Sequence, residues 1–374
     1  MTFGYKSLIN GVATDLDKLL VSKSTANDVL GGATATWGDN QSGSNGDGSI
    51  IPRSSPVMIG PGTDQRWFIT IDRNNNTGAG IKNDGSLWMW GWNANGQLGT
   101  NDIIDRSSPT QVGTSSWVAV ATDGVSSFAI RSDGTLWSWG SNSYGQNGNG
   151  IGATVGRSSP GQVGASSWIA ISAGSQGVLA IRVDGTLWGW GGNERGMLGL
   201  GDTIYRSSPT QVGTSSWASI GGIGFWSTSA IRADGRLFVW GYNSSGELGQ
   251  NDTIHRSSPV QVGTNSWVQA SSGYLSKSAV RSDGTLWVWG DNGDGRLGIG
   301  DTFPRSSPVQ VGTETNWYTA VNDDSGNLIA LKTNGTAWNS GNRTPTNNGQ
   351  YYSSPVQIAT SRYWRAIDSQ VLIS

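Results

Sequence analysis

The tetrapeptide Arg-Ser-Ser-Pro recurs along the chain at nearly equal intervals. It begins at Arg53, Arg106, Arg157, Arg206, Arg256 and Arg305, and a degenerate copy begins at Tyr352. Successive copies lie 47 to 53 residues apart. A unit of this length is too short to bury a core of its own, so neighbouring units must stack on one another. The repeat therefore predicts a single array rather than the roughly two or three independent domains that chain length alone would suggest.

Each unit has the pattern of four short strands. Trp137 and Trp139 share one face of the last strand and Leu136 takes the other, so this strand needs a layer on each side. An Asp-Gly pair precedes it and predicts a tight hairpin, because Gly tolerates positive φ. Antiparallel four-stranded units stacked around an axis meet these needs and form a β-propeller. In the second unit, β-rich runs bounded by Gly, Asp and Pro predict strands near 109–112, 117–122, 126–132 and 135–140.

The two ends of the chain predict how the ring closes. The last unit offers three strands, near 355–358, 363–367 and 371–374. An isolated strand at Ala33–Gly38 matches the missing fourth strand, so we expect it to complete the seventh blade, with Trp37 packing as Trp139 does. The prediction is an all-β, seven-bladed β-propeller of four-stranded antiparallel blades over 31–374, after an N-terminal arm at 1–30. The expected blades cover about 53–100, 106–149, 157–200, 206–250, 256–300 and 305–341, and 353–374 joined to 33–38.

Several motifs give the repeat a family likeness. Residues 133–150, DGTLWSWGSNSYGQNGNG, are followed by a Pro-containing strand that ends in Val-Gly. Together with Trp-Gly-x-Asn and Gly-x-Leu-Gly, as in Trp240 to Asn243 and Gly246 to Gly249, this pattern resembles the regulator of chromosome condensation repeat over about 33–374. The resemblance implies a seven-bladed propeller closed by a shared blade. The family's His-Thr pair, its protruding insertion and its basic tail have no counterpart here, so Ran-type nucleotide exchange has little support.

Composition excludes several classes of partner. Charged residues make up 13% and the net charge is −2, which gives no electrostatic case for binding nucleic acid or an anionic membrane. Cysteine is absent, which rules out disulfides and thiolate sites. No apolar run approaches the ~20 residues of a membrane helix, and the first residues lack the pattern of a secretory signal. We expect a cytoplasmic or virion protein without membrane insertion.

The catalytic and metal-binding inventory is poor. His255 is the only histidine and occupies a variable position, so a Ser-His-Asp triad has no support. The repeated acids of the Asp-Gly pairs are explained by turn chemistry. A segment from Asp72 begins like a calcium loop but lacks the required Gly and Glu, and the Asp- and Asn-rich segments 39–48 and 291–295 are weaker still. We therefore expect a non-enzymatic protein with no cofactor and no metal.

Residues that differ between copies are the candidates for partner binding, since loops on rigid scaffolds carry function and exposed aromatic residues form hot spots. Two sets of loops carry such residues. The pair Phe225-Trp226 has no match in any other copy. Each candidate either contacts a partner or packs against the neighbouring blade. The candidate binding residues are Phe225, Trp226, Tyr274, Trp92, Tyr205, His255 and Phe303.

Two classes of function fit these observations. The favoured one is a structural or recognition protein of a larger assembly, such as a phage decoration or tail protein, that binds a protein or a glycan through its loops. The alternative is a soluble protein-binding regulator or inhibitor of the same family. In the first case, residues 1–30 serve as an attachment or oligomerisation segment; otherwise they form a flexible or lightly docked arm.

Overall fold

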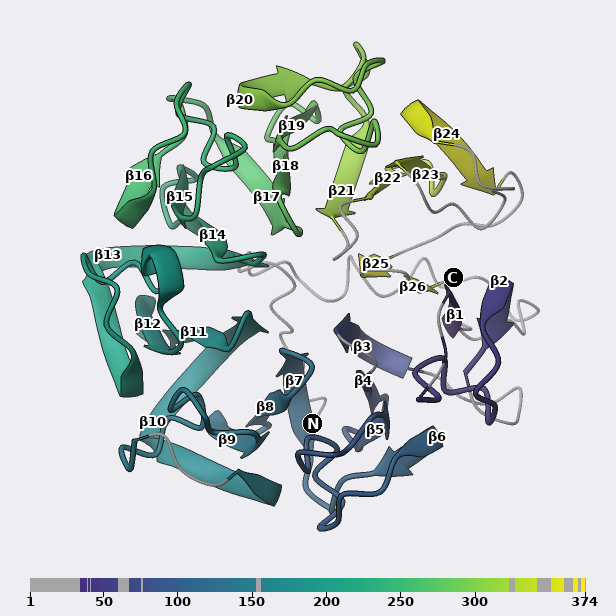
Figure 1. Ribbon diagram of the computed structural model, residues 1–374, viewed down its shortest axis with the longest axis vertical. Helices are drawn as coiled ribbons and strands as arrows, with labels where there is room; N and C mark the ends of the chain where they lie inside the picture. The colour runs from purple at the N-terminus through teal and green to yellow at the C-terminus, as the bar shows by residue number, and fades with distance from the viewer. Residues whose placement is uncertain are drawn as a thin grey trace, which may run out of the picture.

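The computed structural model describes residues 34–38, 40, 42–59, 67–74, 77–152, 156–322, 327–341, 351–359, 366–368 and 371–373. In these residues the chain forms strands and one short 3-10 helix, η1 (Glu194–Gly196). The strands make small sheets that follow one another around a centre (Figure 1). In the same part of the chain, no helix has the length and apolarity needed to cross a membrane. The predicted arm at 1–30 lies outside the described residues.

Three blades are separate four-stranded antiparallel sheets with their strands in chain order. One contains β3 (Trp67–Asn74), β4 (Thr77–Lys82), β5 (Leu87–Gly91) and β6 (Arg106–Gln111). Another contains β17 (Trp267–Ser272), β18 (Ser276–Arg281), β19 (Leu286–Gly290) and β20 (Arg305–Gln310). The third contains β21 (Trp317–Asn322), β22 (Leu328–Lys332), β23 (Ala337–Gly341) and β24 (Tyr352–Ala359).

Three further blades are joined in one ten-stranded sheet. They contain β7 (Trp117–Thr122), β8 (Ser126–Arg131), β9 (Thr135–Gly140), β10 (Arg157–Gly174), β11 (Gly177–Arg182), β12 (Thr186–Gly191), β13 (Arg206–Ile223), β14 (Ser227–Arg232), β15 (Leu237–Gly241) and β16 (Arg256–Gln261). The sheet is continuous because β10 and β13 run from one blade into the next. The first part of β10 pairs with β9 and its second part with β11, and β13 links β12 to β14 in the same way.

The last sheet brings the two ends of the described chain together and makes the seventh blade. It consists of β25 (Ala366–Asp368), β26 (Val371–Ile373), β1 (Thr34–Gly38) and β2 (Arg53–Met58). Ala35 of β1 pairs with Leu372 on one side and with Met58 on the other. The predicted all-β propeller is confirmed, and β1 joins the C-terminal blade. The side chain of Trp37 lies outside the described residues, so its predicted packing stays a prediction.

The predicted division of the chain into blades is wrong by one strand. The strand that begins with Arg-Ser-Ser-Pro is the outer strand of the preceding blade: β6 pairs with β5, for example Gln111 with Trp88. Likewise β2, which was expected to open the first of the predicted blades, completes the closing blade beside β1. A sequence period fixes the length of a repeat but not its phase, so the boundary drawn at Arg-Ser-Ser-Pro was arbitrary.

The repeated tryptophans hold neighbouring blades together, as the predicted core role requires. In five Trp-Gly pairs the Trp is fully buried and donates its indole N–H to a backbone carbonyl of the preceding blade at 2.7–2.9 Å. In blade order these are Trp90, Trp139, Trp190, Trp240 and Trp289. A buried N–H needs such a partner, because leaving it unpaired costs about 1–3 kcal/mol. The motif is therefore a connection between blades as well as core.

Candidate functional site

The strand order places all variable loops at one end of the propeller. In each antiparallel blade, the loops after the first and third strands emerge at the same end, and the hairpin after the second strand emerges at the opposite end. We call these the loop end and the hairpin end. At the hairpin end most copies are alike: Asp133 Oδ1 accepts from the N–H and hydroxyl of Thr135, and Gly134 has φ 83°. Asp234 differs, because it forms an ion pair with Arg232. Turn chemistry accounts for the repeated acids there, as predicted.

An asparagine organises each long loop at the loop end. In the loop between β15 and β16, Asn243 Oδ1 accepts from the Leu248 N–H at 2.8 Å, and its Nδ2 donates to the Ile254 carbonyl at 3.1 Å. The same bonds recur at Asn93 and Asn193. The Trp-Gly-x-Asn motif therefore fixes the loop backbone, and the residue x is free to vary.

Five side chains gather into an aromatic cluster where two blades meet at the loop end. The cluster consists of Phe225, Trp226, Tyr242, His255 and Tyr274. The Phe225 ring lies 4.2 Å from Trp226 and 4.7 Å from Tyr274, centroid to centroid. Tyr242 packs edge-on against Phe225 and Trp226 at 5.9 and 6.1 Å, and it stacks on His255 at 4.8 Å with 24° between the planes. These are the separations at which aromatic pairs attract.

Backbone bonds tie this cluster to three consecutive blades. The Phe225 N–H donates to the Tyr274 carbonyl at 3.1 Å, and the Tyr242 N–H donates to the Trp226 carbonyl at 2.9 Å. Ser175, from the blade before, donates its hydroxyl to the Gly224 carbonyl at 3.0 Å. The cluster is thus held from both sides rather than carried on one loose loop.

Trp226 sits in an unfavourable backbone conformation. Its φ is 55°, in the left-handed region that bulky residues avoid. Gln176 occupies the equivalent turn position of the preceding blade with φ 62°, whereas Val125 and Leu275, at the same position in two other blades, do not have positive φ. What is particular to Trp226 is a large, half-buried aromatic side chain in such a turn. Strained positions of this kind concentrate at functional sites.

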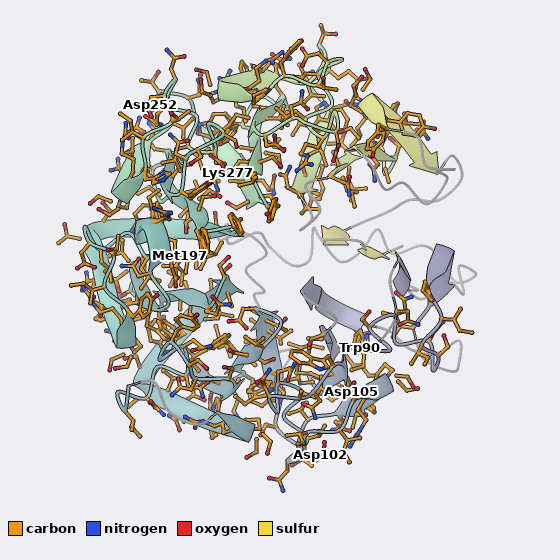
Figure 2. All side chains as sticks on the ribbon, in the orientation of Figure 1. Trp90, Asp102, Asp105, Met197, Asp252 and Lys277 are labelled. Atoms are coloured by element: carbon orange, nitrogen blue, oxygen red, sulfur yellow. The ribbon has the colours of Figure 1, made fainter. Side chains whose placement is uncertain are left out.

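A charged pair is buried beneath the cluster. Lys277 is fully buried and donates to the hydroxyls of Ser227 and Ser272 at 3.0 and 2.7 Å. Burial lowers the pKa of Lys277 to about 7, against the opposing attraction of Glu247, and burial raises the pKa of Glu247. In Figure 2, Lys277 lies inward, between the sheets of β13–β16 and β17–β20, whereas Asp252 lies at the outer rim.

The structure separates the predicted binding residues into two groups. Phe225, Trp226, His255 and Tyr274 meet in the cluster. Tyr205 lies in the preceding blade, between β12 and β13. Its ring packs on Tyr144 of the blade before that, at 5.3 Å between centroids, and its hydroxyl donates to Glu194 at 2.5 Å. That hydrogen bond, and then burial, raises the pKa of Tyr205 to about 12.

Trp92 and Phe303 are not brought into the cluster. Trp92 follows β5, on a blade that Figure 1 shows away from β14 and β17. Phe303 is 69% exposed, and it occupies the position that Ile104, Ile204 and Ile254 hold in other units. The backbone carbonyl at this position accepts from the Arg of Arg-Ser-Ser-Pro in each case, so Phe303 belongs to the repeated scaffold.

The binding residues predicted from the sequence did not include Tyr242, Lys277 or Glu247. A signal was present. Glu247 is the only acid at its position in Gly-x-Leu-Gly, where Gln97, Met197 and Arg296 stand in other units, and Lys277 is the only base at its own position. An unusual acid and an unusual base in successive units mark a contact between blades.

No metal or catalytic constellation is found among the described residues. They contain no group of three His, Cys, Asp or Glu side chains that could hold a metal ion. The calcium-like segment from Asp72 is instead part of a hairpin, with Asp72 paired to Ala79 and Asn74 to Thr77. His255 is stacked on Tyr242, and its Nδ1 accepts the Asn243 N–H at 3.0 Å.

Two surface grooves lie elsewhere. One of about 440 Å³ is lined by Trp117, Arg131 and Pro160, and a smaller one of about 230 Å³ by Trp267, Arg281 and Pro308. These are corresponding residues of different units, so the grooves are a product of the repeat. The aromatic cluster has no such counterpart in other units, and we take it as the candidate site.

Comparison with known proteins supports the repeat assignment. The family described as regulator of chromosome condensation (RCC1) repeat matches residues 84–130, 184–220, 234–276 and 283–321. A second model of the same repeat matches 126–146 and 168–196, and together the matches cover more than half of the chain. The X-linked retinitis pigmentosa GTPase regulator of Canis lupus familiaris is 35% identical over 82 residues, which are 22% of this chain and only 8% of that relative.

Solved structures of similar fold cover almost the whole chain. Human WBSCR16 aligns with a TM-score of 0.79 at 19% identity, over 91% of this chain and 98% of its own. Yeast RCC1 (Prp20), in a complex with Kap60, aligns with a TM-score of 0.78 at 17% identity, over 94% and 93%. At these identities the likeness concerns the fold alone.

Proposed function

Because the chain belongs to the regulator of chromosome condensation (RCC1) repeat family, we propose that it is a non-catalytic recognition propeller that binds a protein partner through the aromatic cluster at its loop end. The single observation that carries this proposal is the cluster itself. Five aromatic rings from two adjacent blades converge where every other blade has smaller or unrelated residues.

The chemistry of the cluster suits a protein surface. Tyr274 is 41% exposed, and Phe225, Trp226 and Tyr242 are half-buried, so their rings are held in place and still reach solvent. Trp and Tyr give large contact areas at a small cost in conformational entropy, which is why they dominate binding hot spots. The buried Lys277 beneath them keeps the two blades in register.

Relatives with this fold point the same way. The solved structures include yeast Prp20 bound to Kap60, and another report on Prp20p describes its binding to Gsp1p and histones. These partners are those of the yeast protein. For this chain they support protein recognition as the class of function, and membership of a larger assembly or attachment through residues 1–30 stays a prediction.

The test is a double substitution, Phe225→Ala with Trp226→Ala. The partner is first isolated on the immobilised wild-type chain and identified, and its affinity is then measured for both proteins. Loss of two hot-spot rings should weaken binding by about 30-fold or more, corresponding to at least about 2 kcal/mol. Circular dichroism should show an unchanged fold, because the repeated interblade bonds are elsewhere.

Phe303→Ala is the matched control. Phe303 is a large, exposed aromatic residue at the rim and lies outside the cluster. Its removal should leave the affinity within about twofold of the wild type. Equal affinity of the double variant and the wild type, or an equal loss in the Phe303 variant, would exclude the cluster as the binding site.

A further inference from the structure

The loop that carries Tyr242 depends on a hydrogen-bond acceptor at position 255. The Asn243 N–H points at this position and donates to His255 Nδ1 at 3.0 Å. In the blade of β3–β6 the same backbone N–H, that of Asn93, donates to Asp105 Oδ1 at 2.7 Å. Two unrelated side chains thus supply the same acceptor, an imidazole ring in one blade and a carboxylate in the other.

The bond fixes the protonation state of His255. Nδ1 can accept a hydrogen bond only while it carries a lone pair, so the proton of the neutral ring is on Nε2. Protonation places N–H groups on both nitrogens, and two donors then face each other at the Asn243 backbone.

The charges around His255 favour its neutral form. Burial, and then the positive charge of Arg195 in η1, lowers the pKa of His255 below its usual 6.5. The other charged neighbours are already engaged: Glu194 accepts from Tyr205, and Arg256 pairs with Asp252 at 2.7 Å. The bond is therefore complete above about pH 6.5 and is lost as the pH falls through the lowered pKa.

His255 reaches the rest of the cluster through Tyr242. The two rings are stacked, the Tyr242 N–H donates to the Trp226 carbonyl, and Tyr242 touches both Phe225 and Trp226. A change in the His255 bond is therefore passed on within two contacts to the residues expected to bind the partner.

We propose that neutral His255 is a positioning residue of the aromatic cluster, and that mild acid releases it and loosens the binding surface. This inference rests on the proposed function only in treating the cluster as the binding surface. The conformational change itself needs no partner to be seen.

The test is ¹⁹F NMR of the full chain labelled with 5-fluorotryptophan, titrated from about pH 7.5 to about pH 5. The resonance missing from a Trp226→Phe variant identifies Trp226. In the wild type the chemical shift of this resonance should titrate with a midpoint below pH 6.5. The His255→Asp variant places at 255 the kind of acceptor that Asp105 supplies in the blade of β3–β6, so there the chemical shift should stay constant. His255→Asn offers a second acceptor that does not titrate and should behave like the Asp variant.

Two results would overturn the proposal. One is a Trp226 resonance that does not move in the wild type. The other is a titration that persists in both His255 variants, which would assign it to another group, such as Lys277 with its pKa of about 7. A titration that follows His255, together with unchanged partner affinity in the Phe225→Ala/Trp226→Ala variant, would leave the positioning role intact and contradict the proposed function instead.

Discussion

At the scale of single residues, the repeat shows which side chains are scaffold and which are not. Trp139 is one of five equivalent, fully buried Trp residues in the described chain, and each donates its indole N–H to a carbonyl of the preceding blade. Lys277 departs from this order, because it places an ammonium group in a position held by Ser127, Val178 and Thr228 in other units. Burial of an ammonium group costs stability, and the attraction of Glu247 does not offset that cost, since the pKa of Lys277 is still lowered.

The substitution Lys277→Met tests this cost. The pKa of Lys277 is about 7 in the folded chain and its ordinary value is 10.5, so between these pH values the unfolded chain binds the extra proton. Wild-type stability should therefore rise, relative to the Met variant, as the pH increases from about 7 to about 10, by an amount on the order of a few kcal/mol. Urea unfolding of both proteins across this range measures it. Parallel stability curves would show that Lys277 is not desolvated.

At the scale of elements, strand pairing explains both the closure and the phase of the blades. β1 is an inner strand of the closing sheet, with β26 on one side and β2 on the other. Residues from the first 60 positions therefore supply half of a blade whose other half ends at Ile373. This arrangement removes the open edges that would otherwise pair with another chain.

Thr36→Pro tests the contribution of β1. Thr36 pairs with Val57 and with Val371, and an inner strand has no place for a residue that lacks an N–H. We expect a loss of roughly 3 kcal/mol or more, seen as a clearly lower melting temperature. Thr36→Val keeps the N–H and the branched side chain and should melt like the wild type. Identical melting of the two variants would mean that β1 does not close the ring.

At the scale of the whole molecule, most of the fold could be predicted from the sequence, but much of the site could not. The Trp-Gly and Asp-Gly pairs specify strands and hairpins because they are local patterns. Their recurrence about every 50 residues specifies the ring. The phase of the blades was not predictable, since pairing of β5 with β6 or of β6 with β7 leaves the same period. Phe225 and Trp226 were visible as unmatched residues. The contact of Phe225 with Tyr274 and the burial of Lys277 near Glu247 depend on which loops meet across blades.

If the proposed function is right, the loop end binds the partner at the junction marked by Tyr274. Site-specific photocross-linking tests this directly. A benzoylphenylalanine is placed at Tyr274, which is 41% exposed at the loop end, or at Val183, which is 70% exposed in a turn of the hairpin end. Binding at the loop end predicts a cross-link to the isolated partner from position 274 and none from position 183. Cross-linking from position 183 alone would place the binding surface on the opposite end and contradict it.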